Sequence, residues 1–338
     1  MLQFNPAISL VRVLSMMLIV VTHFLSWRGT NSFQLSTIGV SSFLLISGYL
    51  YGIKNINQSS MWIKQRINRV LLPFWILALF LSGYLIFTGN YLFAFKQFFE
   101  SMLNLQGLHS IIRLPFSIGS NHLTGLGHCW FLTIIMLCYL LVVLLKNSRL
   151  EFYIDNNLKK SFAFLCVLHL VLSFFNIAIG CFSIFFIGYF FRRWHEKYNY
   201  SFIKKFLPLT LFLLGAVAIR LILRVYIDGS NVYDFFVASF SSNLCAIWGF
   251  IIVDRLVCKR GETFFSSRIW KKIDEMSFYI YLTHYMFLKE PFSLSTLPLH
   301  VKGLLGEIVL FLLLTILSAF ILKFVYAFLL NNFFKTKC

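Results

Sequence analysis

The stretch LVRVLSMMLIVVTHF, residues 10 to 24, is apolar apart from two ionisable side chains, Arg12 and His23. It lies within an apolar run, 7–27, of about the 20 residues that a membrane-spanning helix needs. Eleven residues of α-helix turn through about 1100°, so Arg12 and His23 share one face and lie about 16 Å apart along the axis. A charge facing lipid is costly, so this shared face favours a polar cavity. Taken alone, the pattern also fits Arg12 reaching the inner headgroups and His23 lying at the outer interface.

The composition of the whole chain indicates a membrane protein. Of its 338 residues, 59% are hydrophobic and 12% are charged, and the mean hydropathy is +0.79. A soluble domain of this size could not bury that much apolar surface, so much of its solvent must be lipid. The net charge of +18 could suggest nucleic acid. The basic residues fall in short segments between apolar runs, as the positive-inside rule expects for cytoplasmic loops. This distribution explains the charge without nucleic acid, which is therefore excluded as a partner. The seven cysteines lack metal-type spacing, so no metal site is predicted.

The apolar runs predict about ten transmembrane helices. The first run has no basic leader and no small-residue cleavage site, which favours a retained helix over a signal peptide. The predicted spans are 7–27, 37–53, 71–89, 127–145, 161–177, 179–191, 206–226, 234–254, 275–289 and 304–330.

The charge of the connecting segments predicts the orientation. With the N-terminus inside, 21 lysines and arginines fall in inner segments and five in outer segments. This asymmetry follows the positive-inside rule and supports both the number of spans and two cytoplasmic termini. The predicted fold is an all-α polytopic membrane protein made of a single domain, 1–338, with no appended extracytoplasmic domain. The predicted location is the cell membrane, as a multi-pass protein of a bacterial plasma membrane.

Two further motifs lie near the inner side in this topology. Ser47 and Gly48 in the second span should permit close backbone approach to the first helix. Arg66 and Arg69 lie in the following inner loop, three residues apart and shortly before Pro73. Two guanidiniums at this spacing form a fork suited to phosphate oxygens. The alternative is a basic loop that binds lipid headgroups.

The outer side carries further polar residues. His128 and Trp130 open the fourth span, where a tryptophan often belongs to the interfacial aromatic belt. His284 lies in the outer half of the ninth span, with Tyr281 and Ser277 on the same face. In the seventh span, Arg220 and Arg224 lie four residues apart and therefore share a face. They could pair with Asp228 and Asp234 or could contact a substrate.

These stretches together resemble the membrane-bound acyltransferase family 3, integral-membrane enzymes that acylate cell-surface glycans. Five short motifs occur in the family's order over nearly the whole chain. The matching residues are Arg12 and His23; Ser47, Gly48 and Tyr49; Arg66, Arg69 and Pro73; His128 to Leu132; and Ser277, Tyr281, Leu282 and His284.

The resemblance implies transfer of an acyl group, acetyl by default, from cytosolic acyl-CoA to a hydroxyl of a surface polysaccharide or lipid-linked glycan. His23 would act as general base or would carry the acyl group itself, with Arg12 and His284 as further catalytic residues. Arg66 and Arg69, with Arg12, would bind the phosphates of acyl-CoA, and no metal is implied.

The remaining candidate residues concern the substrate and the partners. Substrate contacts are expected from His128, Trp130, Tyr281, Arg220 and Arg224. The partners are membrane lipid and a glycan or lipid-linked glycan acceptor. Larger family members carry an extracytoplasmic domain that completes transfer, so this chain would act alone or pass its acyl group to another protein.

One alternative is a transporter or flippase for a polysaccharide or its lipid-linked precursor, since many helices with intramembrane charge fit that class as well. Transporters often consist of two related halves. The sequence shows no convincing internal duplication, and its motifs concentrate in the first four spans and the ninth.

Overall fold

Every regular element in the described part of the chain is a helix. The computed structural model describes residues 5–30, 35–56, 58–108, 124–175, 177–198, 211, 214–215, 218, 222, 240–257, 262–289, 292–296 and 303–333. The helices are α1 (Pro6–Trp27), α2 (Leu35–Tyr51), α3 (Ser59–Arg66), η1 (Ile67–Leu71), α4 (Leu72–Phe87), α5 (Tyr91–Met102), η2 (Gly127–Cys129), α7 (Trp130–Lys146), α8 (Arg149–Asn156), α9 (Leu158–Phe175), α10 (Ile177–Tyr198), α13 (Ser242–Leu256), α14 (Glu262–Phe265), α15 (Arg268–Thr283), η6 (His284–Phe287) and α16 (Leu304–Phe333).

The described helices support a membrane protein. Four helical segments are long and apolar enough to cross a membrane: Pro6–Trp27, Ser59–Phe87, Gly127–Lys146 and Leu304–Asn332. They coincide with the first, third, fourth and tenth predicted spans. The second predicted span is the shorter apolar helix α2, and most of the seventh lies outside the described residues. The structure thus confirms a helical protein with several apolar helices, while the count of ten and the position of the termini stay predictions.

The chain divides into two compact units. Unit 1 comprises residues 1–22, 31–59 and 137–274, and unit 2 comprises residues 23–30, 60–136 and 275–338.

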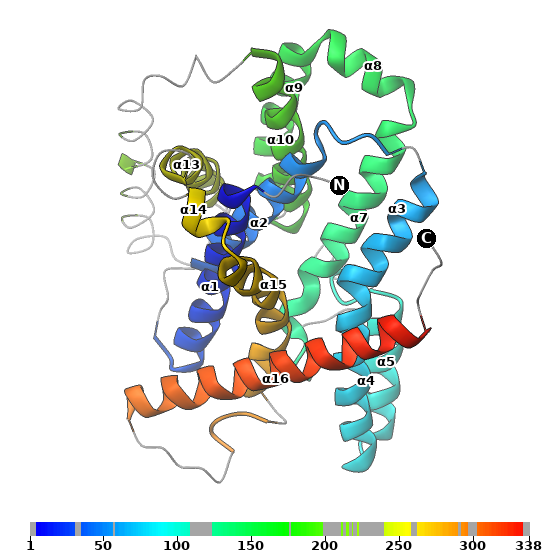
Figure 1. The fold of residues 1–338 in the computed structure, drawn as a ribbon, viewed down its shortest axis with the longest axis vertical. Helices are drawn as coiled ribbons and strands as arrows, with labels where there is room; N and C mark the ends of the chain where they lie inside the picture. The colour runs from blue at the N-terminus through cyan, green and yellow to red at the C-terminus, as the bar shows by residue number, and fades with distance from the viewer. Residues whose placement is uncertain are drawn as a thin grey trace. The chain divides into compact units, whose positions relative to one another are not determined.

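In unit 1, α2 packs against α10 and α13, and α10 also packs against α9 (Figure 1). Two glycines bring α2 and α10 together. A Cβ on Gly48 would collide with the carbonyl of Phe185, and a Cβ on Gly188 would collide with the carbonyl of Leu45. Small residues of this kind permit close crossing of membrane helices. The predicted approach of Gly48 to the first helix was therefore wrong: its neighbour is α10, while Gly39 lies against Ser15 of α1.

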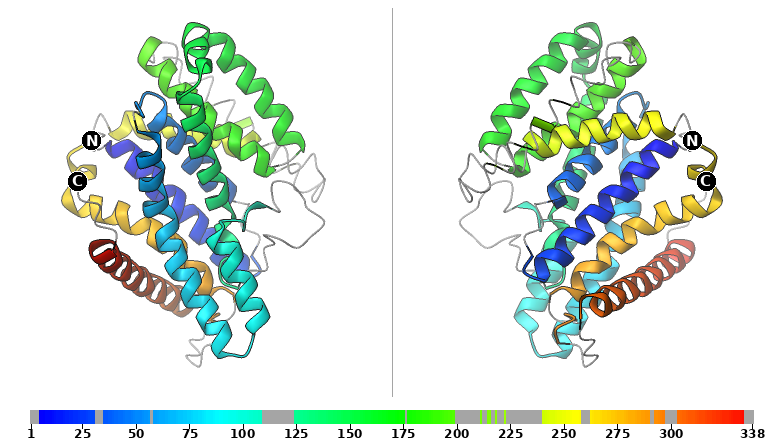
Figure 2. Two further views of the ribbon diagram at one scale, coloured as in Figure 1. Left: turned by 90° about the vertical axis from the view of Figure 1, so that its right-hand side faces the viewer. Right: turned by 90° about the vertical axis from the view of Figure 1, so that its left-hand side faces the viewer.

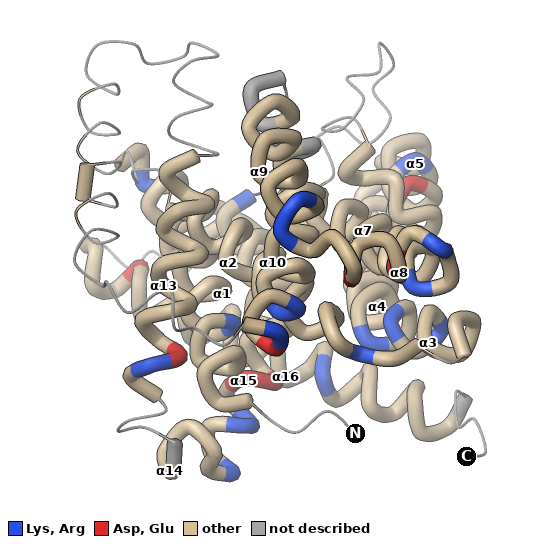
Figure 3. Tube along the Cα trace, turned by 90° about the horizontal axis from the view of Figure 1, so that it is seen from above, with Lys and Arg blue, Asp and Glu red and all other residues tan. Residues whose placement is uncertain are grey.

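An ion-pair cluster in unit 1 joins four helix ends. Arg193 of α10 donates hydrogen bonds to Glu151 and Asp155 of α8 and to the carbonyl of Gly52, which follows α2. Lys146, at the end of α7, also pairs with Glu151 at 2.7 Å. Arg193 and Lys146 are buried, at 9% and 6% side-chain exposure. Figure 3 marks both signs of charge along the chain, α8 among them.

In unit 2, α4 lies beside α5 (Figure 2), and α16 packs on α4. The helices α3, η1 and α4 follow one another without a break, with a π-helical turn at η1 in which Leu72 N–H donates to the carbonyl of Ile67. Pro73 explains this turn, because proline has no N–H and its ring clashes with the carbonyl four residues earlier. The segment around Arg66 and Arg69, predicted as an inner connection between spans, is thus helical, and its inner position stays a prediction. Arg66 ends α3, and Arg69 lies within the π-helical turn.

Candidate active site

Three histidines from distant parts of the sequence meet in unit 2. The ring of His23 lies parallel to that of His284, with centroids 5.2 Å apart. The ring of His128 meets both edge-on, at 6.1 Å from His23 and 4.7 Å from His284. His128 and His284 are buried, at 5% and 0% exposure, while His23 is only partly buried. Of the three, His23 is therefore the one a substrate can reach.

The hydrogen bonds fix the tautomer of each ring. The carbonyl oxygen of Tyr281 lies 2.8 Å from His128 Nε2 and 2.6 Å from His284 Nδ1. A carbonyl only accepts, so both nitrogens carry hydrogen. In a neutral His284 the other nitrogen, Nε2, is then an acceptor, and it receives a hydrogen bond from His23 Nδ1 at 2.8 Å. His23 Nε2 is left with its lone pair, and no described protein group is hydrogen-bonded to it.

This arrangement can act as a base. In the neutral tautomers deduced above, His23 Nε2 is the free proton acceptor of the cluster. A proton taken there makes His23 a cation whose Nδ1–H already points at the lone pair of His284. The buried Tyr281 carbonyl in turn holds His284 in the required tautomer. A base oriented by a second group is the arrangement that acyl transfer to a hydroxyl requires.

A tightly folded loop places His128. Asn104 adopts a left-handed backbone conformation at φ 55°, and its carbonyl accepts a hydrogen bond from the Thr133 hydroxyl at 2.9 Å. Thr133 accepts in turn from the backbone N–H of Gly107, also at 2.9 Å. The Tyr281 hydroxyl then donates to the backbone carbonyl of His128 at 2.8 Å. Tyr281 and His128 are therefore joined by two hydrogen bonds in opposite directions.

A change of helix type places His284. The α-helix α15 ends at Thr283, and His284 begins the 3-10 turn η6. His284 thus lies within the predicted ninth span, 275–289, but one residue beyond the end of its α-helix. The Thr283 hydroxyl bonds to the carbonyls of Tyr279 and Thr315, which anchors this helix end. The tighter turn lets His284 reach the Tyr281 carbonyl three residues earlier.

Tyr285 belongs to the same cluster and escaped the sequence analysis. Its ring meets His23 edge-on at 5.1 Å and lies 4.9 Å from the ring of His128. Its position next to His284 in the 3-10 turn was the available signal.

Arg12 lies in unit 1 against an acidic residue of α15. Arg12 Nη1 is 3.5 Å from Asp274 Oδ2, and the two side chains are 35% and 8% exposed. One turn earlier on both helices, Trp270 Nε1 donates to Ser9 Oγ at 2.9 Å. The residue numbers rise together on the two helices, so α1 and α15 run parallel here. Sequence reasoning did not foresee Asp274 as the partner of Arg12.

A family described as an acyltransferase domain matches residues 5–325, nearly the whole chain. The chain belongs to acyltransferase family 3. All five sequence motifs lie within the matched range, and the resemblance seen in the sequence is confirmed. No curated protein and no solved structure matches the chain.

As a member of acyltransferase family 3, the protein is a membrane acyltransferase. Its other predicted site residues are placed as follows. Arg66 is half-buried beside the ring of Trp62, at 5.4 Å, and Arg69 is exposed. Trp130 is half-buried at the start of α7. Arg220 and Arg224 lie outside the described residues. Among the residues that the structure describes, no group of three His, Cys, Asp or Glu could hold a metal ion.

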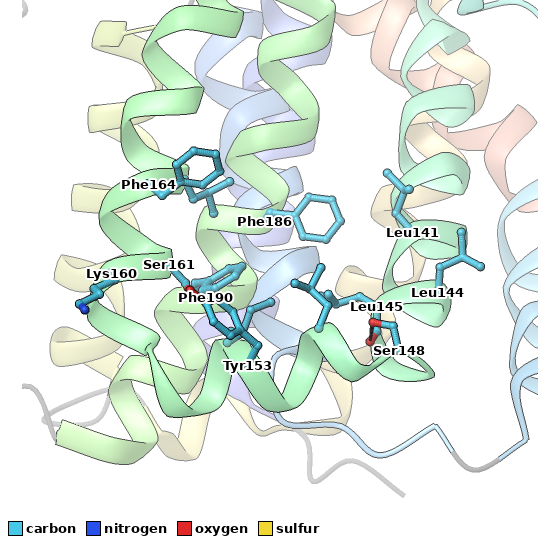
Figure 4. A pocket seen from close by; sticks show the side chains of 13 residues that line it. Leu141, Leu144, Leu145, Ser148, Tyr153, Lys160, Ser161, Phe164, Phe186 and Phe190 are labelled. Atoms are coloured by element: carbon cyan, nitrogen blue, oxygen red, sulfur yellow. Dashed lines mark hydrogen bonds between the residues drawn. The ribbon is translucent and has the colours of Figure 1, made fainter.

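The acyltransferase also has an apolar pocket in unit 1, with a volume of about 780 Å³. It lies among α7, α8, α9 and α10, with Phe186 and Phe190 of α10 on its wall and Lys160 reaching out at its edge (Figure 4). None of the predicted site residues lines it, so the pocket is distinct from the histidine cluster.

Proposed function

We propose that the protein moves an acyl group, acetyl in the first instance, from acyl-CoA to a hydroxyl of a surface polysaccharide or lipid-linked glycan. Family membership supports acyl transfer. The observation that carries the proposed chemistry is the chain from the Tyr281 carbonyl through His284 to His23, which leaves His23 Nε2 as an accessible base.

In the proposed reaction, one histidine accepts the proton and later donates it. His23 Nε2 takes the proton of the acceptor hydroxyl while its oxygen attacks the thioester carbonyl carbon. The carbon–sulfur bond breaks as the tetrahedral intermediate collapses, and the departing thiolate takes the proton from His23. The products are an O-acyl ester and free CoA, and the histidines return to their starting tautomers. His23 could instead carry the acyl group on Nε2, which acid quenching and mass spectrometry of the enzyme would detect.

The remaining residues have roles in binding. Arg66, Arg69 and Arg12 supply positive charge for the phosphates of the donor, since guanidinium groups bind phosphate oxygens in pairs. The π-helical turn at η1 supports this assignment for Arg69, because such turns occur frequently at functional sites. Contact with the acceptor falls to Trp130, Arg220 and Arg224, whereas the buried His128 and Tyr281 hold the catalytic histidines.

The decisive experiment is turnover of acyl-CoA by purified protein in nanodiscs, followed by release of free thiol. His23→Ala should lower the rate by about 10²–10⁴-fold, the usual contribution of a positioned general base. Met17→Ala, at an exposed position of the same helix, should turn over like the parent. A His23→Ala variant that folds normally and keeps full activity would remove His23 from the mechanism.

The same preparation separates the enzyme from a transporter. A ligand that binds only the folded state raises its thermal stability, so acetyl-CoA should raise the melting temperature of the parent protein. A transporter of glycans should respond to glycans and show neither stabilisation by acetyl-CoA nor release of thiol.

A further inference from the structure

The ion pair between Arg12 and Asp274 joins a partly exposed side chain to a buried one. Arg12 Nη1 lies 3.5 Å from Asp274 Oδ2, and the two side chains are 35% and 8% exposed. The buried carboxylate therefore contacts an arginine whose side chain is still partly accessible to a ligand.

The surroundings keep this contact in place. The hydrogen bond from Trp270 to Ser9 lies one turn before Asp274 and Arg12 and ties the same two helices together. Trp270 is itself buried, at 9% exposure. Helices α1 and α15 therefore present Arg12 and Asp274 to each other in a fixed register within unit 1.

We propose that Asp274 is a positioning residue that holds the Arg12 guanidinium in place for a phosphate group of the acyl donor. This inference rests on the proposed function, because it takes acyl-CoA as the donor. A free arginine side chain has many rotamers, and ordering it opposes binding. An anchor that orders Arg12 beforehand removes part of that cost.

Two substitutions separate anchoring from charge. Asp274→Ala releases the Arg12 side chain, which then samples more rotamers. Binding of acetyl-CoA must order that side chain again, so the KM for acetyl-CoA should rise about tenfold. Asp274→Asn keeps an oxygen that can accept a hydrogen bond from Nη1. It removes the negative charge of the carboxylate, and that charge repels the phosphate of the donor. Its KM for acetyl-CoA should stay the same or fall. In both variants kcat should stay within about twofold of the parent value.

A truncated donor distinguishes positioning from a general structural effect. Acetyl-pantetheine carries the same thioester without the phosphates, so its KM should be unaffected by Asp274→Ala. Glu275→Gln serves as the matched control, because Glu275 is the next residue and forms an exposed ion pair with Lys323. It should leave both KM values unchanged.

The possible results separate the positioning role of Asp274 from the proposed function. An unchanged acetyl-CoA KM in Asp274→Ala, or an equal rise for both donors, would overturn the positioning role. If Asp274→Ala fails to fold, Asp274→Ser carries the test, because its side chain is too short to hold Nη1, and an unchanged acetyl-CoA KM in that variant overturns the role. A parent protein that does not turn over acetyl-CoA overturns the proposed function itself, which is seen before any variant is made.

Discussion

His23, His128 and His284 act as one hydrogen-bonded group, and each contributes something different. The Tyr281 carbonyl orders the two buried rings, and His284 passes that order on to His23. Under the proposed function, a neutral histidine takes the place that a carboxylate holds in catalytic dyads. Without a negative charge behind it, the strength of His23 as a base would depend on correct tautomers and close contact.

The dependence of His23 on His284 can be measured with a double-mutant cycle. His284→Ala should lower kcat by about 10²-fold, because His23 loses the acceptor that fixes its tautomer. In the His23→Ala background, His284→Ala should have almost no further effect, since residues that act as a unit are not additive. The measurement is kcat from thiol release for the four proteins. Two independent, multiplicative losses would contradict a shared proton route.

The residues of this site could be predicted from their types and positions, but their contacts could not. His23, His128 and His284 each stood out as polar side chains in apolar runs. Their hydrogen bonds depend on a backbone carbonyl and on the 3-10 turn after Thr283, and neither leaves a trace in residue identity. The partner of Arg12 was missed for a similar reason: Asp274 lies 262 positions away, and spacing within one helix cannot reveal a neighbour on another.

At the scale of elements, glycines decide how α2 and α10 cross. The pattern of small residues correctly predicted a close approach at Gly48, but small residues fit any helix, so the pattern could not name the partner. The residue types did not predict η1 either. The chain accommodates Pro73 with a wider π-helical turn that keeps the helix continuous.

The crossing of α2 and α10 leads to a prediction about stability. Gly48→Ala places a methyl group against the Phe185 carbonyl, and backbone cannot move aside cheaply, so yield and melting temperature should fall sharply. Gly83→Ala is the matched control, because nothing lies within 4 Å of its Cβ. It should be neutral or stabilising by up to about 1 kcal/mol, as expected for glycine inside a helix. Thermal unfolding in detergent compares the two. Equal behaviour would contradict the close crossing.

The ion-pair cluster around Arg193 gives a second prediction at this scale. Arg193→Ala removes a donor to the Gly52 carbonyl and an ion pair whose acidic partners are partly exposed, while Glu151 keeps its pair with Lys146. The loss should therefore destabilise the protein by about 1–3 kcal/mol. Arg149→Ala removes an exposed charge on the neighbouring helix and should change stability by less than about 0.5 kcal/mol. The free energy of unfolding in denaturant titrations checks both. A loss in Arg193→Ala no larger than in Arg149→Ala would contradict a structural role for the cluster.

At the scale of the whole molecule, the predicted positions of the basic residues can be compared with their contacts between helices. The basic residues predicted for inner segments include Lys146 and Arg193, which the structure pairs with Glu151. Such residues therefore also hold helices together. Composition was sufficient to predict a helical membrane protein. Composition could not give the number of spans. A helix such as α8 has both polar and exposed apolar residues, and its composition fits a membrane-spanning helix and an interfacial helix alike.

The parallel contacts of α1 and α15 bear on the predicted orientation. Ser9 meets Trp270 and Arg12 meets Asp274, so both helices run the same way within unit 1. The prediction from charge likewise has the first and ninth spans run from inside to outside. The side of the membrane on which the connecting segments lie can be tested directly, with one residue on each predicted side.

Cysteines introduced at Arg149 and Tyr91 provide that test. Both positions are exposed, and the charge asymmetry places Arg149 inside and Tyr91 outside. A membrane-impermeant maleimide should label Tyr91→Cys in intact cells and should label Arg149→Cys only after permeabilisation. The parent protein sets the background, and its described cysteines are buried or half-buried. Labelling of Arg149→Cys in intact cells would reverse the orientation of that segment. It would also contradict the proposed use of a cytosolic acyl donor, because the arginines proposed to bind its phosphates are predicted on the same side as Arg149.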